Sequence, residues 1–289
     1  IGGAGMSALA TVMAARGIAV TGSDRAQGDY MRLLERAGIA VSLGHGADAI
    51  PTDCDLVVRS PAVPDDNEEL RAARERGIPV TKRAVLLGGL IDSLDAVEVA
   101  GTHGKTTTSG LLAWICRAAG WDPTVMVGGD VLDLGGNAHC GASRYAVIEA
   151  DEYDRTFLHG RPWLALILGI EHDHPDIYPD LESVRAAFAA FVGRVRADGG
   201  VLLRVGPGGA GELAADASAP VEHFGLAEEL PAGHATPEWL AIDRRSGPGD
   251  QRFTVLREGD SLGAFACRLP GRHNVANCLA AVAGAVSMG

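Results

Sequence analysis

The stretch Ala96-Val-Glu-Val-Ala-Gly-Thr-His-Gly-Lys-Thr106 is the most informative part of this sequence. It begins with a mostly apolar segment typical of a central strand, and residues 107–119 have the pattern of a helix that ends before Gly120. A glycine-containing turn with one lysine joins the two. Backbone N–H groups at a helix N-terminus attract phosphates, as does an ammonium group. The segment therefore predicts a phosphate-binding loop over residues 101–106.

The chemistry of this loop suggests how a nucleotide binds. We expect Lys105 to reach the β- and γ-phosphates and the Thr106 hydroxyl to coordinate Mg²⁺. The common form of the motif would place its first glycine at position 99, which is valine here. The shorter Gly-Thr-His-Gly-Lys-Thr form provides the same backbone donors and the same charge. The alternative is a plain turn with an exposed lysine, which the flanking strand and helix disfavour.

Two other apolar segments run directly into acidic residues. Residues 145–149 lead into Glu149-Ala-Asp-Glu152, and residues 164–169 lead into Glu171-His-Asp-His174. Parallel strands end at one edge of a sheet, so both ends are expected beside the phosphate loop. Glu149 is a natural Mg²⁺ ligand, and His174 could contact a phosphate or a metal-bound water. Solvated acids are the alternative for Glu149, and a zinc site is the alternative for the histidines, although a third clustered soft ligand is lacking.

A second glycine turn lies at the start of the chain. Gly3-Ala-Gly-Met-Ser-Ala8 fits the pattern G-x-G-x-x-[GA], and Asp24 follows Gly5 by 19 residues. This is the pattern of an NAD-binding turn. Its physical content is a diphosphate on a helix N-terminus with Asp24 near a sugar or base, and any nucleotide diphosphate satisfies that. A tight turn used only for packing is the alternative.

The rest of the sequence alternates between strand-like and helical segments, which predicts parallel sheets covered by helices on both faces. In the first 94 residues, helices are expected at 6–16, 29–37 and 68–76, and strands at 18–21, 39–42, 56–58 (buried) and 79–80. Beyond Asp95, strands are expected at 96–100, 146–148, 164–168 and 201–205, helices at 107–119, 181–196 (capped by Asp180) and from 274, a loop at 206–219, and a hairpin of 252–257 with 262–267.

Composition limits the class of protein. The 289 residues suggest about two domains, and 47% hydrophobic with 21% charged residues argues against global disorder. A net charge of −12 disfavours a general nucleic-acid binder. No run is long enough to span a membrane and no signal peptide is visible. Five scattered cysteines fit a reducing cytoplasm. The chain starts without Met and stops within a helical pattern, so we expect a fragment.

Taken together, six segments make this sequence similar to the Mur ligase family of peptidoglycan synthesis, over its whole length and in the same order. They are Gly2-Gly-Ala-Gly-Met-Ser7, Thr21-Gly-Ser-Asp24, Gly101-Thr-His-Gly-Lys-Thr-Thr-Thr108, Glu149-Ala-Asp-Glu-Tyr-Asp154, Glu171-His-Asp-His-Pro-Asp176 and Gly271-Arg-His-Asn-Val-Ala-Asn277. The first segment points to the member that adds L-alanine. A related member that recycles a murein peptide shares the fourth segment and the Asp-His pair.

The resemblance implies an α/β fold of two domains. Residues 1–94 would form a Rossmann-like parallel-sheet domain, its first strand truncated, that binds the UDP part of UDP-N-acetylmuramate. Residues 95–289 would form a P-loop ATPase-type α/β domain with a small additional β region, and the C-terminal amino-acid-binding domain would be absent. ATP would phosphorylate the substrate carboxylate, and L-alanine would attack the acyl phosphate. We expect the whole protein to be a cytoplasmic enzyme of cell wall biogenesis that serves cell shape and division. The fragment alone is expected to be inactive.

The resemblance also assigns residues. Lys105, Glu149 and His174 would be catalytic, with Thr106 and Glu149 holding one Mg²⁺ and His174 serving a second. The expected ATP site comprises Gly101, Thr102, His103, Gly104, Lys105, Thr106, Thr107, Asn274 and Asn277. The expected UDP-substrate site comprises Gly3, Ala4, Gly5, Met6, Ser7, Asp24 and Asn137. Several family members use a carbamylated lysine as a metal-site ligand, and no lysine follows Lys105, so that device is excluded.

Three alternatives remain open. The murein-peptide recycling ligase acts on related substrates and shares motifs with this chain. A non-catalytic UDP-sugar-binding module would use the first glycine turn without ligation. An NAD-dependent oxidoreductase would also use that turn, but the phosphate loop argues against it.

Overall fold

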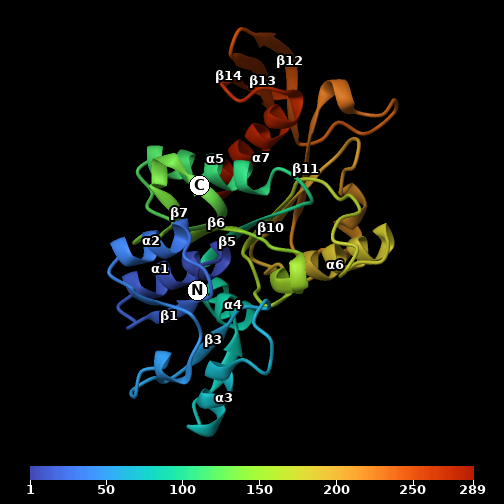
Figure 1. The fold of residues 1–289 in the computed structure, drawn as a ribbon. Coiled ribbons are helices and arrows are strands. Elements are labelled where there is room, and N and C mark those ends of the chain that lie inside the picture. Colours follow the sequence, from blue (N-terminus) through green and yellow to red (C-terminus); the bar gives the residue numbers. More distant parts are fainter.

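A ten-stranded sheet forms the centre of the computed structural model, which describes residues 1–289 (Figure 1). Its strand order is β14-β13-β12-β11-β10-β9-β5-β8-β6-β7, and pairing is parallel from β6 to β12 and antiparallel at both ends. The strands are β5 (Asp95–Ala100), β6 (Thr124–Val131), β7 (Gly136–His139), β8 (Tyr145–Glu149), β9 (Leu164–Ile167), β10 (Gly200–Arg204), β11 (Val221–Leu226), β12 (Trp239–Gly247), β13 (Asp250–Arg257) and β14 (Asp260–Cys267). The predicted central strands and hairpin are confirmed.

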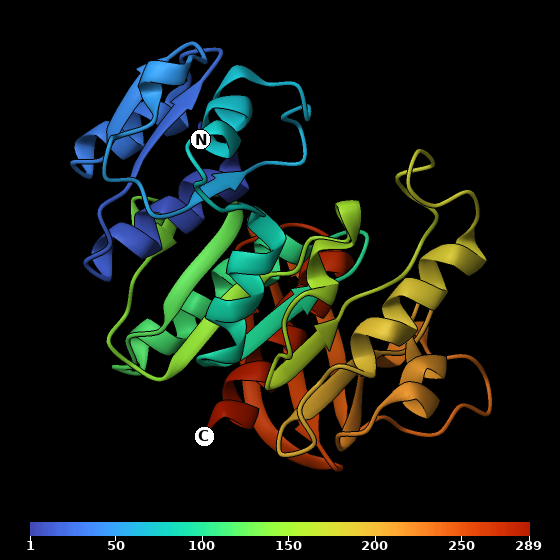
Figure 2. The same cartoon turned by 90° about the horizontal axis from the view of Figure 1, so that it is seen from below.

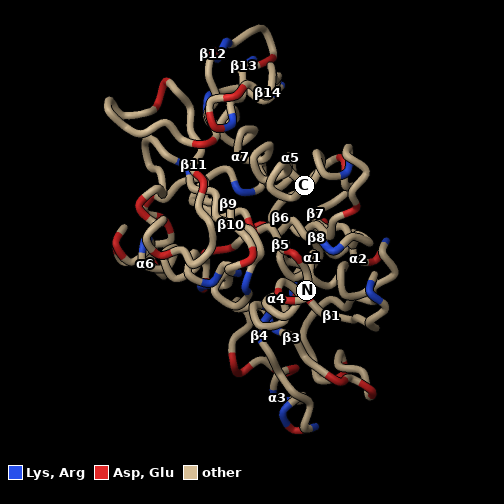
Figure 3. Tube along the Cα trace, turned by 180° about the vertical axis from the view of Figure 1, so that it is seen from behind, with Lys and Arg blue, Asp and Glu red and all other residues tan.

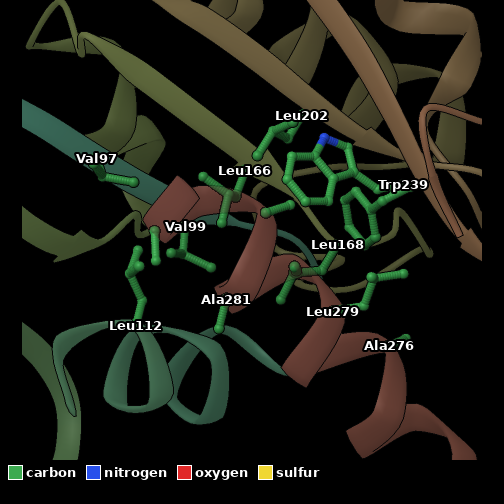
Figure 4. Close-up of a cluster of buried hydrophobic side chains, with 14 of the residues drawn as sticks. Val97, Val99, Leu112, Leu166, Leu168, Leu202, Trp239, Ala276, Leu279 and Ala281 are labelled. Carbon is green, nitrogen blue, oxygen red and sulfur yellow. The ribbon is translucent and has the colours of Figure 1, made fainter. Parts of the chain in front are cut away.

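Helices cover both faces of this sheet. On one face α5 (Lys105–Ala118) and α7 (Arg272–Met288) pack through residues such as Leu112 and Leu279 against Val99 and Leu166 (Figure 4). On the other face α6 (Leu181–Val192) packs with the 3₁₀ helices η3 (Tyr153–Leu158) and η4 (Gly211–Asp216). This two-sided burial explains why the central strands are almost uniformly apolar.

The first 94 residues contain four helices and four short strands. The helices are α1 (Ala4–Ala15), α2 (Asp29–Arg36), α3 (Glu68–Glu75) and α4 (Arg83–Asp92), and the strands are β1 (Thr21–Asp24), β2 (Ala40–Leu43), β3 (Val57–Arg59) and β4 (Val80–Lys82). β1 pairs with β2 and β3 with β4, both in parallel. The pairing is parallel, as expected, but the Rossmann-like sheet expected for residues 1–94 is not continuous, because the two pairs share no strand.

Several expected boundaries also need correction. The first strand is not residues 18–21 but β1, because Ile18 is 53% exposed and pairing with β2 begins at Thr21. Leu56 is exposed and β3 is only half-buried, so the expected buried strand is wrong. The helix capped by Asp180 ends at Val192, before Gly193, and the expected loop 206–219 contains η4. The remaining 3₁₀ helices are η1 (Ala47–Ala49), η2 (Leu132–Leu134) and η5 (Ala227–Glu229).

Two helices of the first 94 residues belong to the core of the large sheet. Leu9 and Val12 of α1 and Ile91 of α4 lie in one buried cluster with Met126 of β6 and Ile148 of β8. Figure 2 shows the rest of this region as a lobe beside the sheet, at the end away from β12–β14. Acidic and basic residues are interspersed along the whole trace (Figure 3). None of the helices combines the length and apolar character that crossing a bilayer requires.

Candidate functional site

The phosphate loop has the backbone geometry that the sequence predicts. Gly101 and Gly104 have φ values of 141° and 84°, in the region that glycine tolerates best. A Cβ at Gly101 would lie 3.0 Å from Leu168 Cβ, and one at Gly104 would lie 2.6 Å from Asn277 Oδ1. α5 begins directly afterwards, at Lys105. The free N–H groups of its first turn therefore face the end of β5, where a phosphate would be bound.

The two asparagines expected near the adenine lie at the start of α7. Asn277 is buried, contacts the position of Gly104 and donates from Nδ2 to Asn274 Oδ1 at 3.2 Å. Asn274 in turn donates to Pro270 O at 2.7 Å. The structure thus brings Asn277 to the phosphate loop across 173 positions of sequence, and Asn274 is fixed beside it.

Lys105 lies back over its own loop and meets a buried acid. Its Nζ donates to Gly101 O at 2.7 Å and to Glu152 Oε1 at 2.8 Å. His174 Nε2 lies 3.5 Å from the same carboxylate oxygen. The expected catalytic residues Lys105 and His174 therefore share one partner, and the sequence reasoning did not single out that partner, Glu152.

The expected Mg²⁺ ligands Thr106 and Glu149 both lie at the glycine pair that ends the buried part of β6. Gly128 N donates to Glu149 Oε2 at 2.7 Å, and a Cβ at Gly129 would lie 3.3 Å from Thr106 Cγ2. Glu149 is only half-buried, and its Oε1 makes no hydrogen bond. A hydroxyl and a carboxylate oxygen are hard donors of the kind that Mg²⁺ prefers, so these residues fit the ion.

The histidine segment does not form a zinc centre. No group of three or more His, Cys, Asp or Glu side chains is placed to hold a metal ion. His172 Nε2 is instead bonded to Tyr178 O at 2.9 Å, and the His174 ring packs edge-on to Tyr153 with centroids 5.4 Å apart. His103, at the tip of the phosphate loop, lies 3.7 Å from Glu171.

The first glycine turn is braced by residues that the sequence reasoning assigned to a substrate. Asn137 is buried and donates to Ala4 O at 2.8 Å and to Ser7 Oγ at 3.3 Å. Asp24 Oδ2 accepts from Gly2 N at 2.8 Å. Burial raises the pKa of Asp24, but hydrogen bonds from the Ala26 and Gly2 amides outweigh this, so the pKa lies below its usual value. α1 therefore begins, at Ala4 after Gly3, in a fixed and partly polar setting.

One acidic segment joins the two glycine turns. Arg83, at the start of α4, donates to Asp151 Oδ2 at 2.9 Å, and a Cβ at Gly5 would lie 2.6 Å from Arg83 Nη1. The next residue of that segment, Glu152, holds Lys105. Residues 149–154 thus connect the start of α1 with the start of α5, the two places where the sequence predicts bound phosphates.

Comparison with known proteins assigns the family. A model described as the Mur ligase middle domain matches residues 99–285, and one described as the Mur ligase family catalytic domain matches residues 1–94. The chain belongs to the Mur ligase family. The resemblance that the six motifs carry, and the α/β fold class that it implies, are therefore confirmed.

The relatives of this Mur ligase chain are similar throughout its length. UDP-N-acetylmuramate–L-alanine ligases from Syntrophomonas wolfei and Salinibacter ruber are 39% and 42% identical over 100% and 98% of the chain. The chain spans 61% and 58% of the length of those relatives. Among solved structures, UDP-N-acetylmuramate–alanine ligase from Thermotoga maritima has a TM-score of 0.84 at 29% identity, with 100% of this chain and 64% of that chain covered.

A second kind of Mur ligase is equally similar in structure. UDP-N-acetylmuramate:L-alanyl-gamma-D-glutamyl-meso-diaminopimelate ligase from Neisseria meningitides has a TM-score of 0.87 at 30% identity, with 100% of this chain and 92% of that chain covered. The fold thus places the chain among Mur ligases, but it does not distinguish the ligase named for alanine from the ligase named for the peptide.

Two residues of the candidate site could not be singled out from the sequence, Glu152 and Arg83. Glu152 is one acid in a run of four, and its burial is a tertiary property. Arg83 is one of many arginines, and its partner Asp151 lies 68 positions away. The only usable signal was that Glu152, the partner of Lys105, and Asp151, the partner of Arg83, both fall within the motif at residues 149–154.

Proposed function

We propose that the complete protein uses ATP to join L-alanine to the carboxylate of UDP-N-acetylmuramate, in the synthesis of peptidoglycan precursors in the cytoplasm. The observation that carries the proposal is the acidic segment 149–154, which contacts a phosphate loop through Lys105 and a glycine turn through Arg83. Two anion-binding helix starts joined in this way suit a reaction between ATP and a second nucleotide. The names of the curated relatives support L-alanine as the acceptor.

The two parts of the chain would divide the work. Residues 1–94 would bind the UDP moiety at the start of α1, with Asp24 and Asn137 bracing the turn. Residues 95–289 would bind ATP on the phosphate loop, with Asn274 and Asn277 toward the adenine. Thr106 and Glu149 would hold one Mg²⁺ and His174 would serve a second, and the ions would neutralise phosphate charge. Precursors made in this way build the cell wall, and hence support cell shape and division.

The residues of the candidate site suggest how phosphoryl transfer proceeds. As the γ-phosphoryl group moves to the substrate carboxylate, Lys105 stabilises the negative charge that develops on it. The products of this step are an acyl phosphate and ADP. The amine of L-alanine then attacks the acyl carbon and phosphate leaves, which forms the amide bond.

Phosphate release by the complete gene product tests this function. We expect release from ATP only when UDP-N-acetylmuramate and L-alanine are both present. Lys105→Ala should lower turnover roughly 100-fold or more, since one charge at the phosphoryl group is worth about that factor, while calorimetry should still detect binding of the sugar nucleotide. Arg185→Ala is a matched control, because this cation lies on α6 and pairs with Glu212 of η4.

Three outcomes would contradict the proposal. Equal turnover without the sugar nucleotide would exclude the ligase. Turnover with the murein tripeptide in place of L-alanine would favour the recycling enzyme. Loss of sugar-nucleotide binding in Lys105→Ala would contradict the division between residues 1–94 and 95–289.

A further inference from the structure

Glu152 is a buried acid at the phosphate loop for which the proposed reaction has no role so far. It lies three residues beyond β8, and its side chain is 5% exposed. The hydroxyl of Tyr178, itself buried, donates to Glu152 O at 2.7 Å, which fixes the backbone. An acid this buried is normally paired, because desolvation of a carboxylate is costly.

The pairing of Glu152 is one-sided. Its Oε1 lies 2.8 Å from Lys105 Nζ and 3.5 Å from His174 Nε2. Its Oε2 is buried and has no hydrogen-bond partner. One carboxylate thus connects a side chain at the start of α5 with a side chain that follows β9, and it retains a free oxygen inside the site.

The contacts of Lys105 show what this arrangement does. An ammonium group has three N–H donors, and two of them are used, by Gly101 O and Glu152 Oε1. One donor remains for a phosphoryl oxygen. Without Glu152, the flexible four-carbon stem of lysine would have to be ordered at each turnover, at a cost in side-chain entropy.

We propose that Glu152 is a positioning residue that holds Lys105 so that its third N–H points to the transferring phosphoryl group. This rests on the proposed ligase function. The charge of Glu152 matters more than its shape, because a charged acceptor holds an ammonium group more strongly than a neutral amide does. Glu152 acts through Lys105 and does not itself touch the nucleotide.

Two substitutions separate charge from shape. Glu152→Gln keeps the shape and removes the charge, whereas Glu152→Asp keeps the charge and shortens the side chain. In the complete gene product, Gln should lower kcat about 100-fold, since misplacement of a catalytic group by about 1 Å costs that much. Asp should retain clearly more activity than Gln. KM for ATP should rise no more than about threefold, because backbone N–H groups still bind the phosphates.

A purely structural role would give a different pattern. The kcat of Glu152→Gln would then equal or exceed that of Glu152→Asp, and this would overturn the proposal. A wild-type kcat in Glu152→Gln would overturn it as well. Combining Glu152→Gln with Lys105→Ala gives a second test. The double variant should be no slower than Lys105→Ala alone, and an additive loss would overturn the proposal. Circular dichroism melting shows which variants are folded. If Glu152→Gln does not fold, Glu152→Asp still tests the proposal.

Nucleotide binding keeps this test independent of the ligase assignment. If the wild-type protein forms no amide, the proposed function fails by itself. The ratio of dissociation constants for ADP and ATP still reports contact between Lys105 and the γ-phosphate. Glu152→Gln should lower that ratio about threefold and Glu152→Asp should lower it less, and an unchanged ratio in Gln would overturn the proposal.

Discussion

At the scale of single residues, the least expected feature is a carboxyl group in the middle of the sheet. Glu98 lies in β5, opposite Ile148 and Ala165 of the neighbouring strands, and is 1% exposed. Its Oε2 has no hydrogen-bond partner. Burial, with repulsion from Asp92, raises the pKa of Glu98 to about 8, although Arg194 opposes the shift. The folded protein therefore retains a proton that the unfolded chain releases near pH 4.5.

This residue makes stability depend on pH. Between about pH 5 and pH 8 the folded state binds more protons than the unfolded state, so the free energy of unfolding falls as pH rises. Glu98→Gln should remove this dependence and stabilise the protein at pH 7 by roughly 2–3 kcal/mol. Urea unfolding at pH 5, 6, 7 and 8 measures it. Glu35→Gln, at an exposed position on α2, is the control, and parallel profiles for the two variants would refute the prediction.

At the scale of elements, the phosphate loop depends on contact between three of them: β5, α5 and the N-terminal part of α7. Gly104 and Gly120 offer a matched comparison, because their φ values are 84° and 82°. A Cβ at Gly104 meets Asn277, whereas one at Gly120 meets nothing within 4 Å. Both substitutions carry the same backbone strain, but only one disturbs the loop.

Alanine at these two glycines should therefore act differently on ATP. Gly104→Ala should weaken ATP binding at least about tenfold, because the Asn277 side chain must move away from the loop. Gly120→Ala should lower stability by roughly 1 kcal/mol through strain alone and leave ATP binding unchanged. Calorimetric titration with ATP measures both. Equal effects of the two variants on ATP affinity would show that contact with α7 is not needed.

The elements also show how far sequence reasoning reaches. The apolar runs of β8 and β9 and the glycine turn before α5 are local patterns, so their structures could be predicted. The division into β1–β2 and β3–β4 depends on which strands pair across the chain, and no local pattern encodes that. The position of Lys105 could be predicted from its motif, whereas its contact with Glu152 depends on a distance across 47 positions.

At the scale of the whole molecule, the first 94 residues and the large sheet share a core. Leu9 of α1 lies with Met126 and Ile148 of the sheet, whereas Leu34 of α2 lies in a separate small cluster with Ala10 and Ile39. Both leucines are fully or almost fully buried. Truncating Leu9 therefore probes the core shared with the large sheet, whereas truncating Leu34 probes the small separate cluster.

Hydrogen exchange should distinguish the two levels. Leu9→Ala and Leu34→Ala should each cost about 2–5 kcal/mol locally. Leu9→Ala should speed exchange in α4 and β8 as well as in α1, because these elements pack in one cluster. Leu34→Ala should speed exchange around α2 and β2 and leave β8 protected. Unchanged β8 protection in Leu9→Ala would show that the first 94 residues are energetically independent of the sheet.

The shared core has a consequence for the choice of substrate. Because α1 is packed onto the face of the sheet, its first turn cannot approach or recede from the phosphate loop without opening that core. The spacing between the two anion-binding turns is then a fixed length, set by packing. In the proposed reaction this fixed spacing would select the substrate. A sugar nucleotide whose diphosphate and carboxylate lie too close together or too far apart would bind at the turn before α1, but its carboxylate would not reach the phosphate loop.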